Sequence, residues 1–254
     1  MFQNITSLIP IIAIAILPSL IWLFFYLKED MHPEPRFWLF AIFLIGMALA
    51  PLVISLEMAV DKLFDFAAIS LGGLLIFIFA PIIEEIAKYG AVHLALNKNP
   101  VLDEPVDGMI YVIVSALGFA AIENIFATFS FVSIGTPGYF TNAFNFLSVR
   151  FISAVALHGL ASGIAGYYFA RFYFPPKVNS KRNPLFIVLG LTLAASLHGA
   201  YNFLIVKNDS NLPLILTGAI LGLAAVWVIF LFIDLKRRAT YQQTPIDSIT
   251  KGKV

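Results

Sequence analysis

Seven apolar stretches alternate with short polar segments along the chain. Each stretch is long enough to cross a bilayer as a helix, since a transmembrane helix needs about 20 mostly apolar residues. The pattern therefore predicts an all-α fold, a polytopic transmembrane bundle of about seven spans. The expected spans are 5–27, 37–60, 66–96, 105–133, the latter part of 139–173, 185–206 and 212–234.

The polar segments between these stretches contain residues that disfavour helix. Prolines flank Glu34 in the loop 28–36, and a Gly-Thr-Pro-Gly sequence begins at Gly135. The chain contains neither a recognisable internal repeat nor a stretch resembling a soluble domain. We therefore predict one integral-membrane domain, 1–235, followed by a polar cytoplasmic tail, 236–254.

The composition supports this interpretation and narrows the available chemistry. Of 254 residues, 60% are hydrophobic and only 12% are charged, which lies outside the range of soluble domains. The net charge of +1 gives no reason to expect a nucleic-acid partner. The absence of cysteine excludes disulfides, Cys-ligated zinc and thiol nucleophiles. Histidines and carboxylates therefore remain as the candidate catalytic groups.

The distribution of Lys and Arg predicts the orientation in the membrane. With the N-terminus outside, twelve of the sixteen basic residues lie in predicted cytoplasmic segments and two, Lys62 and Lys207, lie outside. The other two, Lys88 and Arg150, fall within predicted helices. Because cytoplasmic loops are enriched in Lys and Arg, we expect the N-terminus outside and the C-terminus in the cytoplasm.

The sequence Pro-Ile-Ile-Glu-Glu-Ile-Ala-Lys-Tyr-Gly, at 81–90, places charges inside the third apolar stretch. A carboxylate at the centre of a bilayer costs about 2.5–3.5 kcal/mol on insertion scales, so Glu84 and Glu85 require a reason to be there. Glu84 and Lys88 are four residues apart and share a helix face. Glu85 points about 100° away, so its partners should come from other helices.

Further ionisable residues lie well inside other predicted spans, at similar depth. At 1.5 Å of rise per residue from the cytoplasmic ends, Glu84, Glu123, His158 and His198 lie at roughly 18, 27, 22 and 20 Å. Intramembrane ionisable groups are costly and are therefore functional as a rule. We predict that these four residues and Glu85 form one functional cluster. Ionisable residues nearer the helix ends are interpreted as interfacial charges: Glu57, Lys62, His93 and Arg150.

Four motifs in order resemble the PrsW family of intramembrane proteases, which is distantly related to type II CAAX prenyl proteases and bacteriocin-processing enzymes. The family pattern of EExxK, FxxxE and two later histidine motifs is matched over about 28–203. The matching residues are Glu84, Glu85 and Lys88; Phe119 and Glu123; His158; and His198 with Asn202. Two further similarities are the Pro-Glu-Pro around Glu34 and the Glu-Pro-Val-Asp-Gly that begins at Glu104.

This resemblance implies a helical fold with its active site in the membrane. It also implies site-1 type cleavage of a membrane-bound protein, such as a membrane-anchored regulator, in the plasma membrane of a prokaryote. The expected partners are that membrane-bound protein or peptide substrate and the lipid bilayer. Family convention assigns these proteins a metal, whereas the CAAX relatives resemble glutamate proteases.

The residue chemistry leaves two mechanisms open. With zinc or another divalent metal, His158 and His198 with one carboxylate, Glu123, would be the ligands, and Glu84 or Glu85 would be the base. Glu85 is the first choice of base, because Lys88 should hold Glu84. Without a metal, a glutamate would activate water directly, while His198 and Asn202 polarise the scissile carbonyl and hold the oxyanion.

Two other classes of protein also place charged residues in a membrane. A proton- or ion-coupled transporter uses Glu and His near the midplane, but transporters commonly contain repeats and matched broken helices, and the sequence offers neither. A structural scaffold is disfavoured by the cost of burying these charges. An intramembrane endopeptidase is therefore the preferred interpretation.

Overall fold

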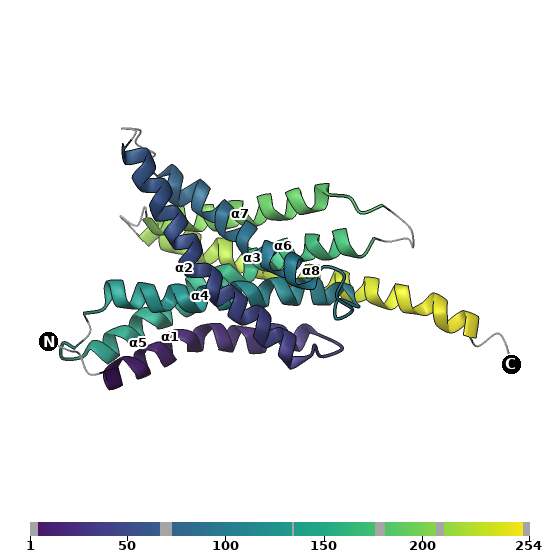
Figure 1. The fold of residues 1–254 in the computed structure, drawn as a ribbon, viewed down its shortest axis with the longest axis horizontal. Helices are drawn as coiled ribbons and strands as arrows, with labels where there is room; N and C mark the ends of the chain where they lie inside the picture. The colour runs from purple at the N-terminus through teal and green to yellow at the C-terminus, as the bar shows by residue number, and fades with distance from the viewer. Residues whose placement is uncertain (1–4, 67–72, 134, 176–180, 207–210, 251–254) are drawn as a thin grey trace.

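The computed structural model describes residues 5–66, 73–133, 135–175, 181–206 and 211–250, and every element in these ranges is helical. The α-helices lie side by side in an elongated bundle (Figure 1). They are α1 (Ile5–Tyr26), α2 (Arg36–Phe66), α3 (Ala80–Leu96), α4 (Pro105–Phe131), α5 (Tyr139–Arg150), α6 (Ala156–Tyr173), α7 (Leu185–Val206) and α8 (Asn211–Thr250). Three short segments adjoin them: η1 (Leu27–Glu29), η2 (Leu75–Phe79) and η3 (Phe151–Val155). The predicted all-α fold is confirmed.

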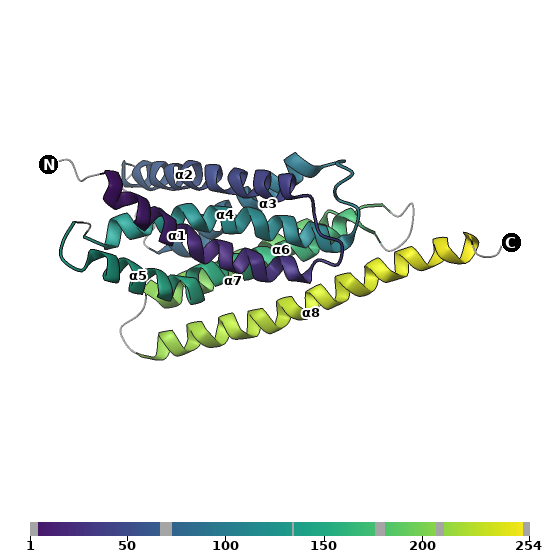
Figure 2. The ribbon, with the colours of Figure 1, turned by 90° about the horizontal axis from the view of Figure 1, so that it is seen from below.

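Helix α4 lies at the centre of the bundle and packs against α1, α2, α3, α6 and α8. Its residues from Pro105 to Ala121 are buried without interruption, as expected for a helix that is apolar all round. The contact with α2 is very close, since a Cβ atom on Gly118 would lie 2.1 Å from the carbonyl oxygen of Phe43. Figure 2 shows α2 and α8 on opposite sides of the bundle, with α4 between them.

Six segments are long and apolar enough to cross a membrane, and they correspond to six of the seven predicted spans. They are Leu8–Glu29, Arg36–Phe64, Pro105–Phe131, Tyr139–Tyr173, Leu185–Val206 and Asn211–Ala239. The other predicted span, 66–96, includes residues 67–72, which lie outside the described residues. Its described part is η2 with α3, a helix of 17 residues that contains Glu84, Glu85 and Lys88. The chain is therefore a multi-pass membrane protein.

Two π-helices directly precede α3 and α6. Segment η2 runs into α3, and η3 joins α5 to α6 without a break in the helix. Short π-helical segments inside α-helices are uncommon and occur frequently at functional sites. The hydrophobic pattern did not predict either segment, because an apolar run is compatible with both an α-helix and a π-helix.

Helix α8 continues past the predicted start of the polar tail at residue 236. It runs through Thr250 as one helix, and its C-terminal part extends beyond the other helices (Figure 2). The tail therefore begins within a helix. Residues 176–180, between α6 and α7, are outside the described part of the chain.

Candidate active site

Helix α3 contributes two carboxylates and one ammonium group to the interior of the bundle. Lys88 Nζ donates hydrogen bonds of 2.9 Å to Glu84 Oε2 and to Glu85 Oε1. All three side chains are buried, and Lys88 is completely buried. The expectation that Glu85 lacks a partner in its own helix is wrong, because the long lysine side chain also reaches the carboxylate three residues before it.

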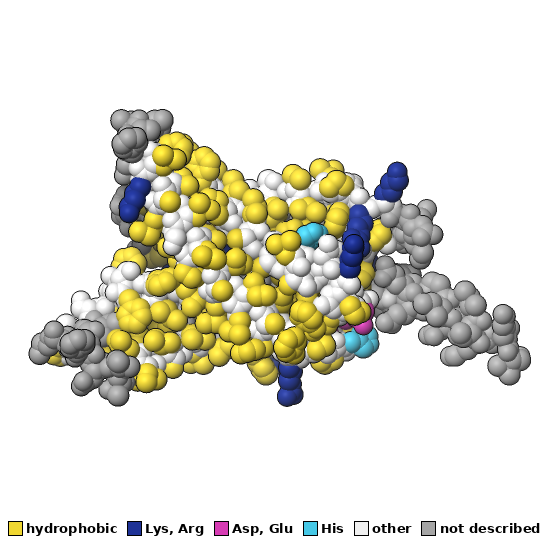
Figure 3. Space-filling model, viewed as in Figure 1, with side chains coloured by type: hydrophobic (Ala, Val, Ile, Leu, Met, Phe, Trp, Pro, Cys, Tyr) yellow, Lys and Arg dark blue, Asp and Glu magenta, His cyan; other side chains and the backbone are white. Residues whose placement is uncertain are grey.

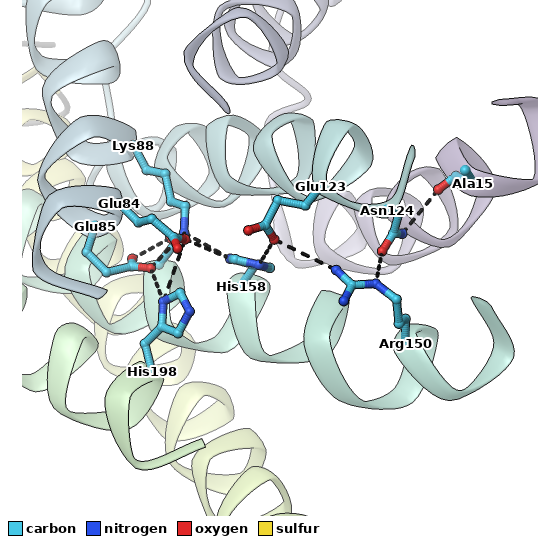
Figure 4. Close-up of polar contacts among 10 residues, drawn as sticks. Ala15, Glu84, Glu85, Lys88, Glu123, Asn124, Arg150, His158 and His198 are labelled. Carbon is cyan, nitrogen blue, oxygen red and sulfur yellow. Dashed lines mark hydrogen bonds and ion pairs between the residues drawn. The ribbon is translucent and has the colours of Figure 1, made fainter. Parts of the chain in front are cut away.

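Helix α6 contributes His158, whose two ring nitrogens contact groups of opposite charge. Its Nδ1 lies 2.9 Å from Lys88 Nζ, and its Nε2 lies 2.6 Å from Glu123 Oε2 on α4 (Figure 4). An ammonium group can only donate, so Nδ1 accepts from Lys88 and Nε2 donates its hydrogen to Glu123. Glu123 thus orients the imidazole from the side opposite to Lys88.

Helix α7 contributes His198, which faces the same two carboxylates. Its Nδ1 lies 3.1 Å from Glu85 Oε1 and 3.9 Å from Glu84 Oε2. Its ring is perpendicular to that of His158, with the ring centres 5.1 Å apart. Ser162 on α6 completes the surroundings of Glu85 by donating a 2.9 Å hydrogen bond to Oε2. Glu85 therefore contacts Lys88 of its own helix, and also His198 and Ser162, which belong to other helices as expected.

A second set of polar contacts extends from Glu123 toward α1. Arg150 on α5 lies 3.8 Å from Glu123 Oε2 and donates a 2.6 Å hydrogen bond to the Asn124 side-chain oxygen. Asn124 in turn donates to the backbone oxygen of Ala15 (Figure 4). Arg150 was expected to be an interfacial charge; instead it is partly buried and contacts the cluster. Its position could not be read from the sequence, because the long side chain reaches back from a helix end.

The formal charges in this cluster nearly cancel. Glu84, Glu85 and Glu123 supply three negative charges, while Lys88 and Arg150 supply two positive charges, beside the two imidazoles. Buried charges are tolerated when they are paired and hydrogen-bonded, and every carboxylate here has a cationic or imidazole partner. The prediction that five ionisable residues from four helices form one cluster agrees with these contacts.

Four of these residues have a donor set suitable for a divalent metal. One ligand atom from each of Glu84, Glu85, His158 and His198 can be chosen so that all lie within 4.8 Å of one another, and all four side chains are buried. Two imidazoles with carboxylate oxygens are a typical ligand set for zinc. Glu123, the expected third ligand, is outside this group and contacts the far nitrogen of His158. Lys88 Nζ contacts three members of the group, so a metal and this ammonium would compete for the same atoms.

Side chains from neighbouring helices stabilise both π-helices. Asn202 on α7 donates to the backbone oxygen of Ile76 in η2, at 3.1 Å. Trp22 on α1 donates through its indole nitrogen to the backbone oxygen of Phe151 in η3, at 2.8 Å. Asn202 was expected to hold an oxyanion beside His198, but here its amide fixes the segment that leads into α3. These two contacts help to position the helices that carry Glu84, Glu85 and His158.

Sequence reasoning missed three polar residues at the site: Ser162, Asn124 and Arg150. Ser162 is four residues after His158 and so shares its helix face, which is a signal that the sequence contains. Asn124 follows Glu123 directly, but its contact with Arg150 depends on how α4 and α5 pack. The sequence therefore predicts the glutamates and histidines of the site better than it predicts the side chains that contact them.

Comparison with known proteins agrees with the geometry. The sequence profile of the "PrsW family intramembrane metalloprotease" family matches residues 34–233. A protein named Protease PrsW from Clostridioides difficile is 30% identical over 198 residues, which cover 76% of this chain and 77% of that protein.

Two further proteins with the same name show similar coverage. The one from Oceanobacillus iheyensis is 27% identical over 91% of this chain and 96% of its own length. The one from Bacillus subtilis is 26% identical over 77% of this chain and 82% of its own length. No solved structure matches the chain. The matched region includes every residue of the buried cluster, and the chain belongs to the PrsW family of intramembrane metalloproteases.

Proposed function

We propose that this protease hydrolyses a peptide bond in or near the transmembrane segment of another membrane protein, with water activated by the Glu84 and Glu85 pair. The observation that carries the proposal is the buried group of Glu84, Glu85, His158 and His198, held between three helices of the bundle. This group contains both a general base and electrophilic donors. A substrate that reaches it must itself be in the membrane.

The contacts favour Glu84 as the base, which revises the preference for Glu85. Glu85 accepts hydrogen bonds from Lys88 and Ser162 and lies beside His198, and its side chain is 1% exposed. Glu84 has its hydrogen bond from Lys88 and is 8% exposed, with both imidazoles about 4 Å away. A general base must contact water and accept its proton on a carboxylate oxygen that is free of other hydrogen bonds. Glu84 is better placed than Glu85 to do this.

His158, His198 and Glu85 would hold a divalent metal, and Glu123 would keep His158 in the tautomer that leaves Nδ1 free to bind it. Such a metal, when bound, polarises the scissile carbonyl and makes water more acidic. Hydrogen bonds to the second nitrogen of a ligating imidazole are a usual feature of such sites. Lys88 would then move from its contact with Nδ1 and stay near the carboxylates.

The same residues also support a metal-free glutamate mechanism. In it Glu84 takes the proton of water, and His198 donates to the developing oxyanion. Asn202 supports this oxyanion only indirectly, because its amide is engaged by η2. A chelator distinguishes the two mechanisms, since it removes activity only when a metal is required.

The charge distribution supports an orientation with the N-terminus outside and the C-terminus in the cytoplasm. Single cysteines at Ser7 and Ser248, in a chain that has no others, can be labelled in intact cells with an impermeant maleimide. We expect labelling at position 7 alone. Labelling at position 248 from outside contradicts the orientation and leaves the proposed chemistry untouched.

The test of the function uses purified protein in proteoliposomes with a single-span membrane protein as substrate. We expect cleavage by the unaltered chain and by Asp61→Asn, which removes an exposed carboxylate from α2, and none by Glu84→Gln or His158→Ala. The neutral amide keeps the shape of the glutamate, so we expect these variants to fold normally. Thermal melting of each variant checks this. Cleavage by Glu84→Gln, Glu85→Gln and His158→Ala at the rate of the unaltered chain would end the assignment of the activity to this site.

A further inference from the structure

Five carboxylates meet at one end of the bundle, away from the intramembrane group. Asp30 and Glu34 belong to the loop between η1 and α2, whereas Asp103 and Glu104 precede α4 and Asp107 lies in its first turn. We call these five residues the carboxylate cluster. Figure 3 shows acidic and histidine side chains together on the surface at this end.

Part of this cluster has an ordinary structural explanation. Asp107 Oδ2 accepts hydrogen bonds from the backbone nitrogens of Asp103 and Glu104, which caps the start of α4. Asp30 accepts from two backbone nitrogens of its own loop, and Tyr111 donates to Glu34. These contacts account for one oxygen of Asp107. Its side chain also lies within hydrogen-bond distance of the Glu34 carboxyl, which can only accept unless one of the two acids is protonated.

Two buried oxygens in the cluster have no hydrogen-bond partner among the described residues. They are Asp107 Oδ1 and Glu104 Oε1, on residues that are 0% and 6% exposed. The His32 imidazole lies 3.0 Å from Glu104 Oε2, and its side chain is 62% exposed. A buried carboxylate oxygen without a donor is costly, so the cluster requires either a proton shared between two acids or a bound cation.

The spacing of three of these carboxylates fits one cation. Asp30, Glu104 and Asp107 each offer an oxygen that lies within 4.8 Å of the other two. Oxygens that bind the same Ca²⁺ at about 2.3–2.6 Å lie no more than about 5 Å apart. An open cavity of about 700 Å³, lined in part by His32, Glu34 and Asp103, lies beside the cluster and gives access from the end of the bundle.

We propose that Asp30, Glu104 and Asp107 bind a hard divalent cation, Ca²⁺ or Mg²⁺, that ties the loop before α2 to the start of α4. Carboxylate oxygens are the ligands that these ions prefer, in contrast to the mixed nitrogen and oxygen donors of the intramembrane group. The bound ion compensates the two unpartnered oxygens. It stabilises the end of α4, the helix that also carries Glu123, and takes no part in peptide-bond hydrolysis.

Terbium luminescence tests the proposal directly, because Tb³⁺ binds to carboxylate sites and its emission is sensitised by nearby aromatic rings. Trp38 lines the adjoining cavity and Tyr111 contacts Glu34, so bound Tb³⁺ has aromatic neighbours. With purified protein in detergent, we expect saturable emission that Ca²⁺ displaces. The same emission is expected from Glu84→Gln, which separates this site from the intramembrane one.

Variants of the cluster provide the matched comparison. Asp107→Asn keeps an oxygen that can cap α4 but loses the charge, and Glu104→Gln and Asp30→Asn likewise lose one ligand charge each. We expect each to weaken Tb³⁺ binding by at least about tenfold, because the charge of the ligands sets the affinity of carboxylate sites. Asp103→Asn, at the exposed rim of the cluster, should weaken it by less than about threefold by removing only a neighbouring charge.

Thermal melting gives a second readout that does not depend on luminescence. We expect Ca²⁺ to raise the melting temperature of the unaltered chain and of Asp103→Asn, but not that of Asp107→Asn. If neighbouring carboxyls share a proton and bind no cation, the folded protein should give no saturable Tb³⁺ emission. That result would overturn the proposal. A Tb³⁺ affinity of Asp30→Asn, Glu104→Gln and Asp107→Asn equal to that of the unaltered chain would overturn it as well.

Discussion

The intramembrane cluster and the carboxylate cluster both contain several buried acids, but they balance their charge differently. In the membrane, Lys88 and Arg150 lie among three glutamates, and both imidazoles contact carboxylates. At the end of the bundle, the His32 imidazole lies beside Glu104, and two buried oxygens have no partner among the described residues.

The two regions obtain their positive charge from different sources. A bilayer offers no water or salt, so the chain itself must supply the cations beside an intramembrane carboxylate. The end of the bundle faces solvent, from which an ion can be taken. The charges of the first region are therefore balanced largely by the chain itself, whereas the second region should respond to Ca²⁺ or Mg²⁺ in the medium.

The largest expected effect follows from neutralising the candidate base. Glu84→Gln should reduce the cleavage rate on the order of 10²–10⁴-fold, the usual contribution of general acid–base catalysis. Its melting temperature should stay close to that of the unaltered chain, because Lys88 retains Glu85 as a partner. Initial rates in proteoliposomes measure the effect, and Asp61→Asn is the matched loss of an exposed carboxylate. A rate within twofold of the unaltered chain would remove Glu84 from the mechanism.

Replacing the buried lysine breaks the charge balance on which the comparison depends. Lys88→Met should lower the free energy of unfolding by about 3–5 kcal/mol, because two buried carboxylates lose their counter-charge. Zn²⁺ should restore much of this stability, since the metal and the ammonium compete for the same atoms, while Ca²⁺ should raise the melting temperature of Lys88→Met only as much as it raises that of the unaltered chain. Thermal melting with each ion and with EDTA measures this. Stability of Lys88→Met equal to that of Lys88→Arg without metal would contradict the account.

Glu123 should affect activity through His158 without contacting substrate. Glu123→Gln keeps an oxygen near His158 Nε2 but removes its charge, and we expect a 10- to 100-fold loss of metal affinity or activity, the typical cost of losing such a support. A shift in the imidazole NMR signals of His158 would show the changed surroundings. An unchanged spectrum together with unchanged activity would mean that Glu123 serves packing alone.

The smallest expected effect concerns the π-helix before α3. Asn202→Ala removes one hydrogen bond to Ile76, worth about 0.5–1.5 kcal/mol, so we expect a threefold to tenfold loss of cleavage rate. Asn145→Ala, at an exposed position of α5, is the matched control. A loss as large as that of Glu84→Gln would instead support the direct oxyanion role that the sequence suggested for Asn202.

The sequence predicted the bundle and the ionisable residues of the site because a membrane makes both conspicuous. Apolar length indicates a span, and the cost of an intramembrane charge singles out Glu84, Glu85, Glu123, His158 and His198. The predicted spans begin within a few residues of the observed helices, but α2 and α8 continue past the predicted ends at 60 and 234, and 67–72 lies outside the described residues.

Other features depend on helix rotation and packing, which one sequence does not reveal. The contact of Lys88 with Glu85 and the approach of Arg150 to Glu123 both depend on side-chain reach. The π-helices and the amide contact of Asn202 with Ile76 arise only when α7 packs on η2. The carboxylate cluster was also hidden, because acidic residues in a polar loop look like solvated charges.

Cleavage in water enriched in ¹⁸O tests the central claim most directly. The account predicts that the new carboxyl terminus of a single-span substrate contains one ¹⁸O atom, detected by mass spectrometry, and that this product is absent with Glu84→Gln. A product without ¹⁸O would contradict hydrolysis by water. A yield of labelled product from Glu84→Gln, Glu85→Gln and His158→Ala equal to that of the unaltered chain would contradict hydrolysis at this cluster.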